Sequence, residues 1–183
     1  MTPVATADPQ TDALMSMLHA AFGAESVALA AFELAGGRLP DCLLRHTLEG
    51  SRFDLSPLLL ADALRHAAPA LARRVDPDHM FGFALQSPLL LSATVAEALA
   101  AGGPNCEARL DAGTAHRVAH AWVSTLTGDR FDDVVVLHSR TAWSAWFGCE
   151  VWDRTWIIAD CAASRIWLLC LTGDTAPWLP RHR

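Results

Sequence analysis

The residues of this sequence with the clearest metal-binding spacing are His116 and His120, four positions apart in AGTAHRVAHAWVSTL. A broad apolar stripe in this segment predicts a helix from about Ala112 to Leu126. Two imidazoles four residues apart share one helix face and can bind the same metal ion. The segment lacks the glutamate of the zinc-protease motif, and the sequence marks no third ligand unless the fold brings His138 beside the pair. We therefore predict no bound metal and no cofactor.

The other polar residues also lack a catalytic pattern. The aspartates of GDRFDD (Asp129, Asp132 and Asp133) do not have the spacing of a calcium-binding loop, which favours a solvated turn. No serine stands in a GxSxG elbow. The five cysteines are odd in number and lack CxxC spacing, which is typical of reduced thiols in a cytoplasmic protein. These features favour a protein that is not an enzyme.

Composition argues against two classes of partner. The chain has 183 residues and a formal net charge of −6, and its basic residues are all arginines that form no basic stripe, which disfavours nucleic-acid binding. No apolar run reaches the roughly 18–20 residues that span a bilayer. The first residues lack the basic and apolar regions of a signal peptide. We therefore expect a cytoplasmic protein without membrane insertion.

The segment from Phe131 to Thr172 organises the predicted fold and contains five of the seven tryptophans. Its connections are too short for parallel crossovers, so they favour an antiparallel meander, with Asp153-Arg154 as a hairpin turn. The expected strands are apolar or alternating runs at 134–137, 143–152, 155–161 and 165–171.

The N-terminal part predicts helices and a first hairpin. Ser56-Pro57 and Ser87-Pro88 each place serine at an N-cap and proline at the first helical position. The expected elements are a helix at 12–22, strands at 26–34 and 42–48, a helix at 56–74 split at Pro69, a strand at 80–86 and a helix at 88–101.

Together these elements predict an α+β fold. We expect a largely antiparallel sheet with a C-terminal four-stranded meander and about four helices packed on one side. The best boundary follows Pro104. It would divide an N-terminal α+β region, 1–104, from a C-terminal helix plus β-meander region, 105–183, or lie within one compact domain.

The second expected meander strand carries the predicted binding residues. By period two, Trp146, Glu150 and Trp152 share a face opposite Phe147 and Val151. Indoles among polar groups are favoured anchors of protein interfaces. We therefore predict that Trp146, Glu150 and Trp152 bind another protein or a second copy of this chain.

The C-terminal residues resemble a known family. A short strand, the sequence LDAG (Leu110–Gly113), a helix, the step DVVVL (Asp133–Leu137) and strands around Val151–Thr155 follow in this order. This order is similar to a SpoA-type domain of the flagellar switch and type III secretion cytoplasmic-ring proteins. The step lacks the family's usual glycine, and the helix is longer. The resemblance implies an assembly role with no catalytic residue, and often an intertwined partner chain.

We therefore predict a non-catalytic interaction or assembly protein, and the resemblance implies a component of a type III secretion-type apparatus. One alternative is an immunity or chaperone-like protein that binds a secreted partner. A second alternative is a small-molecule sensor, because the opening LHAAFGAESVALAAFELAGG resembles the helix-then-hairpin start of GAF-like sensory domains.

Overall fold

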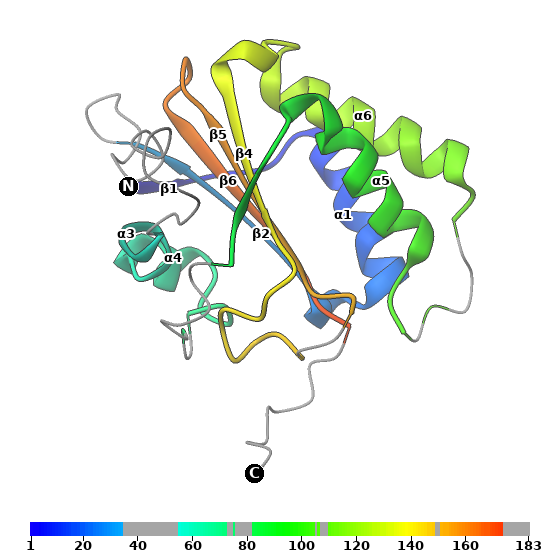
Figure 1. The fold of residues 1–183 in the computed structure, drawn as a ribbon, viewed down its shortest axis with the longest axis horizontal. Helices are drawn as coiled ribbons and strands as arrows, with labels where there is room; N and C mark the ends of the chain where they lie inside the picture. Colours follow the sequence, from blue (N-terminus) through cyan, green and yellow to red (C-terminus); the bar gives the residue numbers. More distant parts are fainter. Residues whose placement is uncertain are drawn as a thin grey trace, which may run out of the picture.

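The computed structural model describes residues 1–34, 55–72, 75, 82–104, 106, 110–148 and 151–173. Its six strands form one antiparallel sheet in the order β1-β2-β6-β5-β4-β3 (Figure 1). The strands are β1 (Thr2–Val4), β2 (Val27–Glu33), β3 (Ala84–Gln86), β4 (Val134–Ser139), β5 (Arg154–Asp160) and β6 (Arg165–Leu171). The expected α+β class with an antiparallel sheet is confirmed.

Side-chain caps mark the start of two of the longer helices. The longer ones are α1 (Pro9–Phe22), α5 (Leu91–Ala101) and α6 (Ala112–Thr127), and the short ones are α3 (Ser56–Leu59) and α4 (Asp62–Ala67). The carboxylate of Asp111 accepts the N–H of Thr114 at the start of α6, and Gly128 ends this helix in the left-handed conformation. Asp8 caps α1 by accepting two backbone N–H groups, so this helix begins earlier than predicted. None of the described helices is long and apolar enough to cross a membrane.

The two central strands, β5 and β6, are apolar on both faces, and this requires cover on both sides of the sheet. Every residue of β5 is buried, as is every residue of β6 after Arg165. Helices α1, α5 and α6 pack on the face that includes Trp156, Ile158 and Leu169. The leucines of α3 and α4 pack on the opposite face, against Ile157 and Leu168. The expectation that the helices lie on one side is therefore wrong (Figure 1).

In the described residues, the predicted four-stranded meander has three strands, β4, β5 and β6. The segment 143–148 forms turns, with a single bridge from Ser144 to Val75. Its alternating residues are typical of a strand, but Trp143 is fully buried and donates from Nε1 to Oγ1 of Thr155 at 2.9 Å. Its ring also meets Phe147 edge-on, with centroids 5.4 Å apart. The segment 143–148, which we call the plug, therefore packs its large side chains against the sheet.

Two neighbouring predictions also need correction. Arg154 is the first residue of β5 and not part of a hairpin turn, and Asp153 is buried and accepts from Oγ1 of Thr172 at 2.7 Å. The long helix expected after Ser56 is divided into α3 and α4, and α4 ends at Ala67, two residues before Pro69.

The remaining elements follow the sequence closely. The strand predicted at 26–34 is β2, whereas its predicted hairpin partner at 42–48 lies outside the described residues. The helix predicted at 88–101 begins with the 3₁₀ turn η5 (Pro88–Leu90) and continues as α5. Strands β2 and β3 come from the region 1–104 and pair with β6 and β4 from the region 105–183. The two predicted regions thus contribute to one sheet.

Replacing Trp167 by alanine should destabilise the fold more than replacing Trp152. Trp167 is 6% exposed on the face covered by the long helices, whereas Trp152 is half-buried. Emptying a buried aromatic site costs about 3–5 kcal/mol of unfolding free energy. Urea unfolding of both variants checks this, and equal midpoint shifts, or a larger shift for Trp152→Ala, would contradict the difference in burial.

Candidate functional site

The predicted histidine pair lies on the exposed surface of α6. The rings of His116 and His120 stack with centroids 6.1 Å apart and planes 16° apart. His138 lies instead on β4, where its ring packs against Trp156 at 5.1 Å. In the described part of the chain, no three His, Cys, Asp or Glu residues come together as a metal site.

Two of the predicted binding residues, Trp146 and Trp152, lie outside the strands. Trp146 is half-buried and meets Phe147 edge-on, with ring centroids 5.0 Å apart. Trp152 is also half-buried, and Glu150 lies outside the described residues. The period-two argument that grouped the three therefore has no strand to support it.

The thiols have the surroundings of structural cysteines. Cys170 is fully buried, and burial raises the pKa of its thiol above the usual range. Cys161 lies in the turn after β5, and the pKa of its thiol is raised by partial burial and by the carboxylates of Asp160 and Asp133. A nucleophilic cysteine needs the opposite, a lowered pKa in positive surroundings.

A cluster of charged side chains that sequence reasoning missed lies where β4 ends and β5 begins. Arg154, Trp156 and Ile158 alternate along β5, so Arg154 faces the layer of long helices. Its Nη2 lies 3.6 Å from Oε1 of Glu97 on α5. Arg140, just after β4, approaches the same oxygen at 3.8 Å. One carboxylate therefore faces two guanidinium groups at distances longer than a hydrogen bond.

His138 lies on the same face of the sheet, opposite Trp156 in the β4–β5 ladder. Burial lowers the pKa of its imidazole to about 4, with further lowering by the charges of Arg154 and Arg140 and a smaller opposite effect of Glu97. The imidazole is thus neutral near pH 7. Its Nε2 is buried and has no hydrogen-bond partner among the described residues, and the same holds for Nη1 of Arg154.

Hydrogen bonds to the hydroxyl of Thr94 hold the side chains below this cluster in place. Nε1 of Trp156 and Nε2 of Gln86 each donate to Oγ1 of Thr94 at 3.1 Å. The hydroxyl of Thr94 in turn donates to the carbonyl of Leu91 on the same helix. Strands β3 and β5 are thereby joined to α5, and the indole that packs against His138 is held in place.

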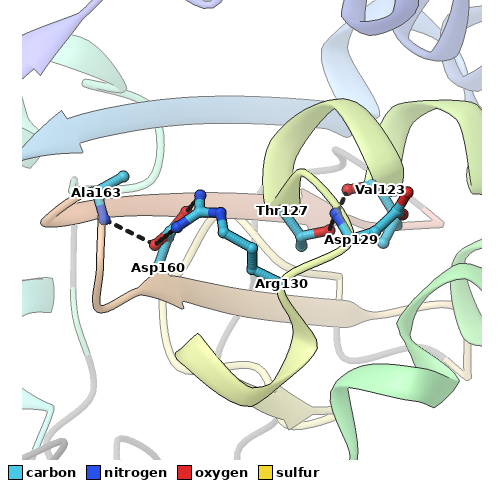
Figure 2. Close-up of polar contacts among 6 residues, drawn as sticks. All are labelled: Val123, Thr127, Asp129, Arg130, Asp160 and Ala163. Carbon is cyan, nitrogen blue, oxygen red and sulfur yellow. Dashed lines mark hydrogen bonds and ion pairs between the residues drawn. The ribbon is translucent and has the colours of Figure 1, made fainter.

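A second charged pair closes the opposite end of β5. Nη2 of Arg130 lies 2.6 Å from Oδ2 of Asp160, and Nη1 lies 3.4 Å from Oδ1 (Figure 2). Asp160 is fully buried and also accepts the N–H of Ala163 at 2.8 Å. With its charge paired and its oxygens hydrogen-bonded, the carboxylate acts as a structural tie between the β5–β6 turn and the segment after α6.

The end of α6 directs Arg130 toward this carboxylate. The hydroxyl of Thr127 donates to the carbonyl of Val123 at 2.9 Å and accepts the N–H of Asp129 at 3.2 Å (Figure 2). Gly128 and Asp129 both have positive φ, 55° and 59°. These two residues reverse the chain direction, so that the side chain of Arg130 lies across the end of β5.

The edge of the sheet at β3 has an exposed apolar surface. Leu85 on β3 and Leu89 and Leu90 on η5 are 58%, 69% and 54% exposed. We call these three leucines the leucine edge. Among the described strands β3 pairs only with β4. The sequence signal was the run ALQSPLLL, which was interpreted as the end of a strand and the start of a helix, not as an exposed surface.

Comparisons with protein-family models, curated proteins and solved structures found no match. Function is therefore inferred from the chain's own residues.

Replacing His138 by glutamine should flatten the acid sensitivity of the fold. The unfolded chain takes up a proton on His138 near pH 6.5, but the folded chain does so only near pH 4, so stability falls as the pH drops through this window. The slope stays below the one-proton limit of about 1.4 kcal/mol per pH unit, because the imidazole is partly exposed.

Urea unfolding at several values across this window measures the effect. The carboxylates titrate in both proteins, so only the difference from wild type reports on His138. The exposed His116 offers a matched control, because His116→Gln makes the same substitution outside the charged cluster. An unchanged slope in His138→Gln would contradict the lowered pKa.

Replacing Arg130 by methionine should destabilise the protein by about 1.5–3 kcal/mol, the range for a hydrogen-bonded charge. The reason is that Asp160 would remain buried with only the N–H of Ala163 as a donor. Arg130→Met combined with Asp160→Asn should recover part of this loss, because the uncompensated charge is then absent. Chemical unfolding measures both.

The exposed Arg117 on α6 gives the control, since Arg117→Met should change stability by less than about 0.5 kcal/mol. Single Asp160→Asn completes the comparison. If the stability lost in the double variant equals the sum of the losses in the two single variants, the two side chains have no coupling energy, which would contradict the prediction.

Proposed function

We propose that this protein is a non-catalytic assembly protein that binds a second copy of itself through the leucine edge. One observation carries the proposal: three of the five exposed large hydrophobic side chains among the described residues lie within six consecutive positions. They are Leu85, on the edge strand β3, and Leu89 and Leu90, in the turn that follows it. Grouped exposed apolar side chains are typical of protein interaction sites.

The geometry of β3 suits pairing with another strand. Its inner side follows β4 from Ala84 opposite His138 to Gln86 opposite Val136. An edge strand presents backbone N–H and C=O groups on its outer side, which can extend the sheet into a neighbouring chain. Because β3 has only three residues, backbone pairing contributes little, and the leucines must supply most of the association free energy.

Charge favours a second copy as the occupant. The stretch from Gly82 to Ala96 contains no ionisable side chain, although the whole chain has a net charge of −6. Two copies related by a two-fold axis place the same surface against itself, so a charged residue there would lie close to residues of the same charge in the other copy. An uncharged edge avoids this repulsion, and antiparallel pairing of β3 with its copy obeys the two-fold symmetry.

The expected association is weak. Burying the exposed part of each leucine contributes roughly 1 kcal/mol, or roughly 6 kcal/mol for both copies, against an association cost of roughly 4–15 kcal/mol. We therefore expect monomer and dimer to exchange with concentration. The specific setting implied by the SpoA-type resemblance is a type III secretion-type apparatus, and self-association supports an assembly role of this kind.

Replacing Leu89 and Leu90 together by serine should abolish dimer formation while leaving the fold intact. Both leucines are more than half exposed, so the monomer loses little packing. The loss of association should reach about 2 kcal/mol or more, the scale of an interface hot spot. Sedimentation velocity over a wide concentration range, with thermal melting of the same samples, measures both quantities.

The matched control is Leu60→Ser with Val151→Ser, which removes two other exposed hydrophobic side chains far from β3 in sequence. This variant should associate like the wild type. A wild-type protein that stays monomeric at every concentration would overturn the proposal. Loss of association in Trp146→Ala, but not in the leucine variant, would move the contact to the predicted tryptophan surface.

A further inference from the structure

We infer that the cluster of Arg154, Arg140, His138 and Glu97 is a binding site for a small carboxylate ligand. The inference is independent of self-association at the leucine edge. It starts from the position of the cluster, on the helix-covered face of the sheet where β4 ends and β5 begins. The inner side chains come from the sheet, and Glu97 comes from α5 above it.

The guanidinium of Arg154 lacks the partners that a buried charge needs. Its side chain is 8% exposed, and its Nη1 has no hydrogen-bond partner in the part of the chain that the structure describes. The carboxylate of Glu97 lies 3.6 Å from Nη2, which is an ion pair longer than a normal hydrogen bond. An unsatisfied buried donor on a charged group is costly, so an acceptor placed at Nη1 would be strongly favoured.

The balance of charge points to a ligand with one negative charge. Arg154 and Arg140 carry two positive charges, and Glu97 supplies one negative charge, so the cluster has a net charge of +1. His138 adds none near neutral pH, because burial and the two arginines lower its pKa to about 4. A carboxylate neutralises this excess, whereas a phosphate dianion would bring a second negative charge beside Glu97.

The shape of the donors also suits a carboxylate. The planar guanidinium presents two parallel N–H groups that match the two oxygens of a carboxylate. The buried Nε2 of His138 can supply a further donor in the tautomer that carries its proton there. Because Trp156 packs against this ring and is itself bonded to Thr94, the imidazole is held in place before the ligand arrives.

Glu97 acts as an internal competitor for the same position. Its side chain and that of Arg140 are more than half exposed, so both can move aside at the rim of the cluster. A ligand carboxylate would then replace the loose contacts of Glu97 with hydrogen bonds to Arg154. Removing the charge of Glu97 should therefore strengthen binding, which an adventitious surface contact would not show.

The experiment titrates the full-length ¹⁵N-labelled protein with sodium acetate, sodium phosphate or sodium chloride at matched ionic strength and neutral pH. The readout is the imidazole nitrogen signal of His138, assigned with His138→Gln. Acetate should shift this signal to saturation, and chloride should not. Glu97→Gln should bind acetate roughly fivefold more tightly, since a competing charge is gone.

Arg154→Met should weaken acetate binding by roughly tenfold or more, because the inner donors are lost. The variant should fold, since it replaces an unsatisfied buried charge by an apolar side chain. If it does not fold, Arg140→Met tests the outer donor on an exposed residue. Arg117→Met, on the exposed face of α6, should bind like the wild type.

Three results would overturn the inference. The first is the absence of a saturable response of His138 to acetate. The second is equal acetate binding in wild type, Glu97→Gln and the arginine variants of the cluster, which would show an adventitious ion only. The third is tighter binding of phosphate than of acetate, which would show that the site is built for a dianion.

Discussion

The two central strands impose the main constraint on this fold, because both of their faces must be shielded from water. In β5 and β6, Ile157 and Leu168 face one side while Trp156 and Leu169 face the other. Neither face can be left to solvent without exposing a continuous apolar surface. The long helices shield one face, and the short helices with the plug at 143–148 shield the other. The connection from β1 to β2 carries α1, that from β2 to β3 carries α3 and α4, that from β3 to β4 carries α5 and α6, and that from β4 to β5 carries the segment 143–148.

The sequence predicts a helix or strand correctly where the residues of that element determine its structure by themselves. Asp111 and Gly128 mark the ends of α6 because capping is a matter of adjacent groups. The strands β2, β5 and β6 were found because their apolar runs match buried strands. The strand prediction for the segment with Trp143 was wrong. Apolar and polar residues alternate there as in a strand, but the indole of Trp143 forms a hydrogen bond to Thr155, twelve positions further along the chain.

The charged cluster could not have been predicted from spacing. Glu97 lies on a helix more than forty positions before Arg154, and Arg140 is separated from Arg154 by the plug. The pair Asp153-Arg154 was interpreted as the hairpin turn between two expected strands of the meander. In the structure Arg154 instead opens a buried strand, and its charge is left with one distant carboxylate. Only the antiparallel register of β4 and β5 brings His138 and Arg154 to the same face.

The edges of the sheet differ from each other, and this limits how the molecule can grow. One edge is β1 and the other is β3, each with three residues. Pro3 lies in β1, and Pro88 follows β3 after one intervening residue, so neither strand offers a long run of backbone donors. In the proposed dimer, contact between two β3 edges would use the leucine edge of both chains, and among the described residues β1 carries no comparable group of exposed leucines. Edge pairing through the leucines would therefore stop at two chains.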